Sequence, residues 1–87
     1  MLKIVAHKRD RRSTLRLEGD VIGLWVDELR RSSEEPLAAG AQLTVDLAGV
    51  GFVDREGIEL LRRLGARGVA VVNASRFVAE QLKAQTR

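Results

Sequence analysis

The chain has 87 residues, enough for one domain, and 45% of them are hydrophobic, so a compact core can form. Only 3% are aromatic, which predicts a core of Leu, Val, Ile and Ala, and the absence of cysteine excludes disulfides and thiolate metal sites. The net charge of +3 is uneven, because residues 1–16 hold six basic residues and one acidic residue. We expect one soluble, cytoplasmic domain over residues 1–87, without a signal peptide or membrane insertion.

Two short strands joined by a charged turn are predicted first. Leu2–His7 and Ser13–Glu18 both alternate apolar and polar residues, and the polar segment Lys8–Arg12 joins them. We expect the basic turn to be a solvated surface, with attraction to an acidic protein or a nucleic acid as the alternative. Nucleic acid is the weaker alternative, because no aromatic residues for base stacking are interleaved with the basic ones. His7, the only histidine, is expected on a strand near the sheet edge.

An amphipathic helix should follow the hairpin. Asp20 is the expected N-cap, and Ser32–Ser33 and Pro36 should end the helix or split off its last turn. The apolar stripe at i, i+3, i+4 and i+7 consists of Ile22, Trp25, Val26 and Leu29. Trp25 is expected to serve either as part of the core or as an anchor for a partner.

The centre of the chain predicts a strand, a loop and a second helix. Leu43, Val45 and Leu47 alternate with polar residues, and a second apolar stripe at helical spacing begins at Ile58. The loop Asp54–Gly57 lies between them. In open α/β sheets, binding sites form where strands end and helices begin, so we expect the site at this loop.

The remaining chain predicts one more strand and one more helix. Val69–Val72 is a continuous apolar run, which suggests a strand covered on both faces. Ser75 is the expected N-cap of the last helix, whose inner face should consist of Phe77, Val78 and Leu82. The predicted order is β-β-α-β-α-β-α. Right-handed crossovers then give an α/β domain with a small mixed four-stranded sheet and helices mainly on one face.

Motifs for catalysis and cofactor binding are weak or absent. Gly49-Val50-Gly51 lacks the third glycine of a dinucleotide loop, and the sequence contains neither a phosphate loop nor a Gly-x-Ser-x-Gly elbow. A single histidine without cysteine argues against a zinc site. Asp54 and Glu56 are expected to cap and stabilise the helix start. We therefore expect no enzymatic activity, catalytic residue, metal or cofactor.

Three segments resemble the STAS domain family. They are Leu15–Gly19, Leu43–Val50 and the Phe52-Val53-Asp54-x-x-Gly57 pattern, and the resemblance covers roughly residues 13–83. The family includes bacterial anti-sigma factor antagonists, cytoplasmic tails of sulfate transporters and a small subunit of lipid-transport ABC systems. The resemblance implies the STAS fold and a protein-binding role in bacterial regulatory signalling.

The loop departs from the antagonist pattern. Where antagonists carry a phosphorylatable serine or threonine after the loop aspartate, this chain has Arg55, and the next position is Glu56. Another position that is often acidic in the family is Ile22 here. Arginine does not mimic phosphoserine, because its charge has the opposite sign. We therefore expect an interaction module without the phosphorylation switch.

The expected partner is another protein: an anti-sigma factor, a kinase-like protein or an ABC ATPase. The alternatives are a regulatory subunit of an ABC-type lipid transporter ATPase and a small-ligand or nucleotide-binding module; the oligomeric state stays open. The candidate partner-binding residues are Asp54, Arg55, Glu56 and Gly57 in the loop, with Trp25, Glu59 and Arg62 as further interface candidates. Arg55 is expected either to anchor a partner carboxylate or to be solvated and paired with Glu59 one turn later.

Overall fold

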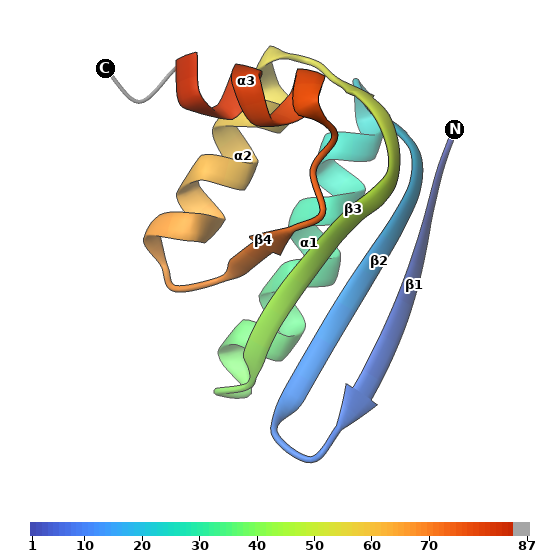
Figure 1. Ribbon diagram of the computed structural model, residues 1–87. Helices are drawn as coiled ribbons and strands as arrows, with labels where there is room; N and C mark the ends of the chain where they lie inside the picture. Colours follow the sequence, from blue (N-terminus) through green and yellow to red (C-terminus); the bar gives the residue numbers. More distant parts are fainter. Residues whose placement is uncertain (85–87) are drawn as a thin grey trace.

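The computed structural model describes residues 1–84, and its elements follow the predicted order (Figure 1). In chain order they are β1 (Leu2–Arg9), β2 (Arg12–Val21), α1 (Leu24–Ala38), β3 (Gln42–Val53), α2 (Arg55–Ala66), β4 (Ala70–Val72) and α3 (Arg76–Ala84). The predicted α/β class and the order of strands and helices are confirmed.

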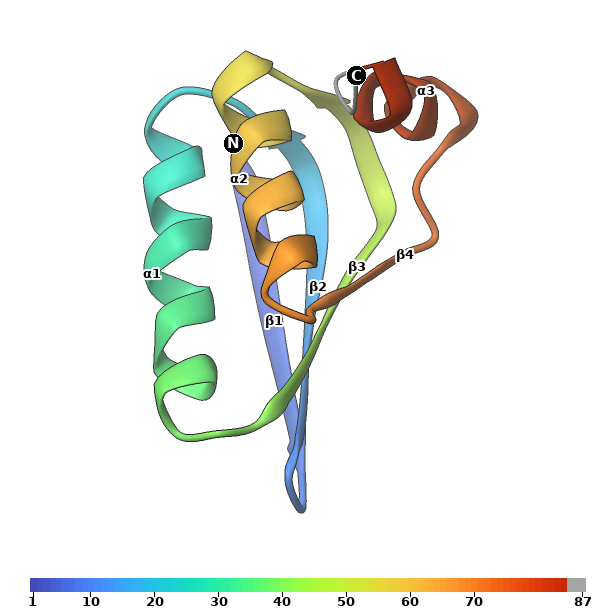
Figure 2. The ribbon, with the colours of Figure 1, turned by 90° about the vertical axis from the view of Figure 1, so that its left-hand side faces the viewer.

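The four strands form one mixed sheet in the order β1-β2-β3-β4. β1 is antiparallel to β2, whereas β2, β3 and β4 are parallel. Figure 2 shows α1 and α2 side by side on one face of the sheet, with α3 near the carboxyl-terminal end of β3. Two β-α-β crossovers therefore bring the ends of β2 and β3 together with the beginnings of α1 and α2.

The core lies between the sheet and these two helices. Every second residue of β2 and β3 points towards the helices, and most of these residues are apolar. Helical spacing directs one apolar stripe of each helix towards the sheet. The fully buried large side chains are Leu15, Leu17, Val21, Val26, Leu29, Val45, Leu47, Val53, Ile58, Leu61, Leu64 and Val78. Burial of each such side chain contributes about 1.5–3 kcal/mol.

The hairpin turn is shorter than predicted. β1 and β2 stay paired as far as Arg9 and Arg12, so only Asp10 and Arg11 remain in the turn. Asp10 has φ 57°, a left-handed conformation that aspartate tolerates better than most residues. Gln42 N–H donates to the Arg11 carbonyl over 2.8 Å, which ties the turn to the start of β3.

The start of α1 differs from the prediction. Asp20 does not cap the helix, because β2 continues to Val21 and the chain turns only at Gly23. Gly23 is the N-cap, with φ 57° and no capping side chain of its own. Ile22 precedes the helix and is half-buried, so the helical stripe begins at Trp25.

The end of α1 also differs. Pro36 lies inside the helix, which continues to Ala38 instead of ending at Ser32–Ser33. The buried Pro36 ring packs inwards, and proline removes only one backbone donor from the ladder. Ala39 is the C-cap and is followed by Gly40, which has φ 81°; Ala41 N–H donates to the Pro36 carbonyl over 2.9 Å, as in a Schellman motif.

Two predictions near the C-terminal end of the described chain are wrong. β4 is a short edge strand with Ala70 and Val72 exposed, so it is not covered on both faces as predicted. In α3, Val78 is buried but Phe77 is 56% exposed, because neighbouring residues of a helix point in different directions. The predicted cap is confirmed: Val78 N–H donates to Ser75 Oγ over 3.2 Å.

Candidate functional site

Asp54 joins the two loops at the carboxyl-terminal end of the sheet. It is the N-cap of α2, and its Oδ1 accepts from Gly57 N–H over 2.8 Å. Its Oδ2 accepts from Gly23 N–H over 2.9 Å, and its own N–H donates to the Val21 carbonyl over 3.0 Å. One carboxylate therefore fixes the start of α2 and also the turn that leads into α1, which replaces the cap expected from Asp20.

Gly57 allows the first turn of α2 to pack closely on the strand ends. A Cβ atom at this position would lie 2.6 Å from Val53 Cγ1 and 3.0 Å from the Val21 carbonyl oxygen. Real Cβ atoms essentially never approach so closely. The glycine of the Asp54–Gly57 loop is therefore required by packing, and any role in binding falls to the exposed residues beside it.

Arg55 and Glu56 are the exposed residues of the loop. Within residues 1–84, Arg55 forms no ion pair, so the alternative in which it pairs with Glu59 is not found. Glu56 lies in the first turn of α2, where a carboxylate interacts favourably with the helix dipole. The guanidinium at the expected acceptor position is thus free to contact a partner.

An exposed aromatic pair lies beside this loop. The rings of Phe52 and Phe77 are stacked, with centroids 6.2 Å apart and planes at 24°. Phe52 is 43% exposed at the end of β3, and Gln81 Nε2 donates to the Val53 carbonyl over 3.4 Å, which holds α3 against this strand end. Sequence analysis missed the pair, because it assigned Phe77 to the core. The sequence did offer one signal: Val78 can supply the buried side chain of this helical turn, which leaves its neighbour Phe77 free to point outwards.

A third exposed apolar side chain lies at the same end of the molecule. Leu24, the first residue of α1, is 84% exposed and follows Gly23, which donates to Asp54. Figure 1 shows the beginnings of α1, α2 and α3 at one end of the sheet. We define the loop surface as Leu24, Phe52, Arg55, Glu56 and Phe77. It combines exposed apolar side chains with Arg55, a cation that has no ion-pair partner in the described part of the chain.

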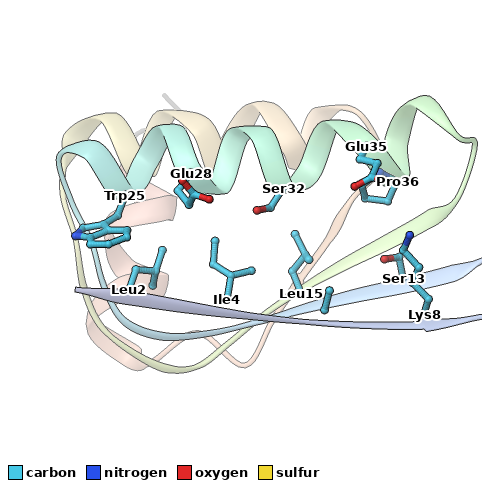
Figure 3. Close-up of a pocket in the computed structure, with 11 residues that line it drawn as sticks. Leu2, Ile4, Lys8, Ser13, Leu15, Trp25, Glu28, Ser32, Glu35 and Pro36 are labelled. Atoms are coloured by element: carbon cyan, nitrogen blue, oxygen red, sulfur yellow. The ribbon is translucent and has the colours of Figure 1, made fainter.

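The other interface candidates are distributed over two regions. Glu59 is exposed and Arg62 is half-buried on α2, where they follow Arg55 at i+4 and i+7 and so share its side of the helix. Trp25 is half-buried against the core and lies beside Leu2, in a groove between α1 and β1 (Figure 3). Glu59 and Arg62 therefore lie on the same side of α2 as Arg55, whereas Trp25, next to Leu24 in the chain, lines the groove beside β1.

The carboxylate of Asp46 lies on the sheet face opposite the core and accepts two hydrogen bonds. Hydrogen bonds to its Oδ1 from Ala48 N–H, over 2.9 Å, and from Asn73 Nδ2, over 3.2 Å, lower the pKa of Asp46 below its ordinary value. The Arg16 guanidinium on the neighbouring strand lowers this pKa further. The carboxylate ties β3 to the turn after β4 and is a structural group.

The described residues include no group of His, Cys, Asp and Glu side chains arranged to hold a metal ion. None of the helices within residues 1–84 has the length and hydropathy needed to cross a membrane.

Comparison with known proteins finds similarity at the level of structure. No family model matches the sequence, and no curated protein matches it significantly. The anti-sigma factor antagonist SpoIIAA, in its unphosphorylated form, superposes with a TM-score of 0.72 at 19% identity, over 93% of this chain and 82% of SpoIIAA.

Two further solved structures share the architecture. Mglu matches with a TM-score of 0.68 at 23% identity, over 83% of this chain but only 20% of its own length. An uncharacterized protein of the DUF3478 family from Shewanella loihica PV-4, described as having a SpoIIAA-like fold, matches with a TM-score of 0.59 at 11% identity, over 95% of this chain and 75% of that one. The chain therefore has the SpoIIAA-like, STAS-type fold that its sequence pattern predicts.

Proposed function

We propose that this protein is a non-enzymatic, cytoplasmic interaction module of bacterial regulatory signalling, and that the loop surface docks onto a partner protein. The observation that carries the proposal is the exposed Arg55, which forms no ion pair with any described residue, at the same end of the sheet as the stacked Phe52–Phe77 pair. Aromatic and arginine side chains are the residue types that contribute most binding energy in protein interfaces. The likeness to an anti-sigma factor antagonist supports a protein as the partner.

The chemistry of the surface indicates what the partner presents. Arg55 can donate two parallel hydrogen bonds to a carboxylate, which lysine cannot reproduce. The adjacent aromatic pair and Leu24 require an apolar patch next to that carboxylate. We infer a partner such as an anti-sigma factor or kinase-like protein, with an acidic residue at the rim of a hydrophobic patch.

Binding at this surface is proposed to be constitutive. Arg55 occupies the position of the acceptor hydroxyl in the antagonist pattern, and no serine or threonine lies between Val45 and Ala74. A phosphate therefore has no hydroxyl side chain to modify in the loop. Phosphopeptide mapping of the protein after incubation with cell lysate should show no phosphate on this segment.

Affinity capture with the variant Arg55→Glu tests the proposed surface. The substitution should leave folding unchanged, because Arg55 is exposed and unpaired, but it should abolish recovery of the partner that the wild-type protein captures. Arg63→Glu is the matched control, since Arg63 is also an exposed, unpaired arginine of α2. Calorimetry with the purified partner then compares affinities. Equal affinity of the Arg55→Glu variant and the wild type would exclude this loop as the interface.

A further inference from the structure

The outer edge of β1 is an unpaired strand edge. β1 pairs only with β2, so within residues 1–84 no segment occupies its other side over eight residues. Backbone N–H and C=O groups along such an edge are ready to pair with another extended chain. Figure 1 shows this edge at the side of the sheet farthest from β4.

A groove runs along the inner face of β1. α1 packs mainly against β2 and β3, and on β1 Ile4 is only half-buried and Ala6 is exposed. Figure 3 shows the groove, with Leu2, Ile4 and Lys8 of β1 on one side and Trp25, Glu28, Ser32 and Glu35 of α1 on the other. It encloses about 330 Å³, enough for a few apolar side chains.

The two faces of β1 differ in charge. On the open face of the sheet, alternation places the cations Lys3 and Arg9, together with His7, and no carboxylate lies anywhere on β1. On the groove face, the wall contributed by α1 carries Glu28 and Glu35, and the floor holds the apolar side chains of Leu2, Ile4 and Leu15, with Lys8 at one end. Acidic side chains are therefore favoured on the open face, and apolar side chains are favoured in the groove.

We propose that β1 binds an extended acidic segment of a partner protein as a fifth strand. Every second side chain of the segment is apolar and enters the groove beside Ile4 and Trp25. The intervening side chains are acidic and lie on the open face next to Lys3 and Arg9. Main-chain hydrogen bonds to β1 supply affinity, and the alternating side chains supply specificity.

A second copy of this chain is the less favourable occupant. Edge-to-edge pairing of two β1 strands would bring the rows that contain Lys3 and Arg9 close together, and β1 itself supplies no carboxylate to compensate; Glu18 of β2, beside Lys3, is paired with Arg16. Like charges on paired strands are destabilising. The basic residues thus oppose self-association and select a partner of opposite charge.

The probe for this site is a capped octapeptide of alternating valine and glutamate. Titrated into isotope-labelled protein, it should shift backbone amide signals of Leu2–Arg9 and Trp25 and slow hydrogen exchange along β1. The same peptide with two adjacent central N-methyl groups cannot pair through either edge and should bind at least about tenfold more weakly. A valine–lysine octapeptide should also bind at least about tenfold more weakly.

Charge exchange is the decisive comparison. The double variant Lys3→Glu and Arg9→Glu should prefer the valine–lysine peptide over the valine–glutamate peptide. Arg63→Glu with Arg76→Glu makes the same change in net charge on exposed helical residues and should keep the wild-type preference. Absence of binding, shifts confined to other elements, equal binding of the N-methylated peptide or self-association through β1 would each overturn the proposal.

Discussion

At the scale of single residues, Asp54 connects two loops through the two oxygens of its carboxylate. Each of its carboxylate oxygens accepts one backbone N–H, from Gly57 and from Gly23, and these donors belong to different loops. An ordinary N-cap satisfies orphan donors of its own helix only. Asp54 therefore stabilises α2 and also compensates for the absence of a capping side chain at the start of α1.

Replacement of Asp54 should lower the stability of the fold more than replacement of an ordinary N-cap does. Asp54→Ala leaves two backbone donors without their acceptor, so the free energy of unfolding should fall by about 2 kcal/mol, the upper end of the N-cap range. Asp54→Asn keeps one acceptor oxygen and should lose less. Urea denaturation measures both changes, with Glu56→Ala as the control in the same turn. An unchanged midpoint for Asp54→Ala would show that the carboxylate does not stabilise these loops.

At the scale of elements, the sequence predicted α2 better than α1. The buried face of α2 repeats at regular helical spacing and its cap lies in its own sequence, so both signals are local. The start of α1 depends instead on Gly23 and on Asp54, which is 31 positions away. Sequence reasoning assigned the cap to Asp20, the nearest carboxylate, because a contact of that separation leaves no local pattern.

Contacts between residues that are far apart in the sequence also limited the prediction of the candidate site. The Asp54–Gly57 loop could be located from the order of strand, glycines and helix, whereas the sequence left open whether Arg55 binds a partner or pairs with Glu59, and the structure shows it exposed. The stacking of Phe52 on Phe77 could not be foreseen, because it depends on how α3 packs against the end of β3. Contacts between distant elements are set by tertiary packing and are not visible in periodicity.

The glycines of α2 provide a test of how this helix packs. Gly57→Ala should lower the free energy of unfolding by about 1–3 kcal/mol, because the new methyl group would overlap Val53 Cγ1 and the Val21 carbonyl. Gly65→Ala is the matched control, since a Cβ there meets no atom within 4 Å and should stabilise the helix by roughly 0.5–1 kcal/mol. Thermal or urea unfolding compares the two. Equal effects of the two substitutions would contradict the close packing at Gly57.

At the scale of the whole molecule, the two ends of the sheet differ in chemistry. The carboxyl-terminal end of the parallel strands carries the loop surface, with exposed apolar side chains. The opposite end is the tip of the β1–β2 hairpin, whose turn is visible in Figure 1. Basic residues are concentrated in and next to this turn. Four of these residues form no ion pair within residues 1–84, namely Lys8, Arg9, Arg11 and Arg12.

This hairpin tip should bind nucleic acid only weakly. Its four cations can neutralise about four phosphates, so the affinity should fall roughly hundredfold between 50 and 200 mM salt. The segment Lys8–Arg12 contains no aromatic residue on which a base could stack. Fluorescence anisotropy with labelled single-stranded and duplex DNA should therefore show weak, sequence-independent binding at low salt and almost none at physiological salt.

Arg11→Gln with Arg12→Gln should reduce both the affinity and the salt dependence. Sequence-specific binding that persists at physiological salt would instead make the hairpin the functional surface and contradict the proposed role as a protein-binding module.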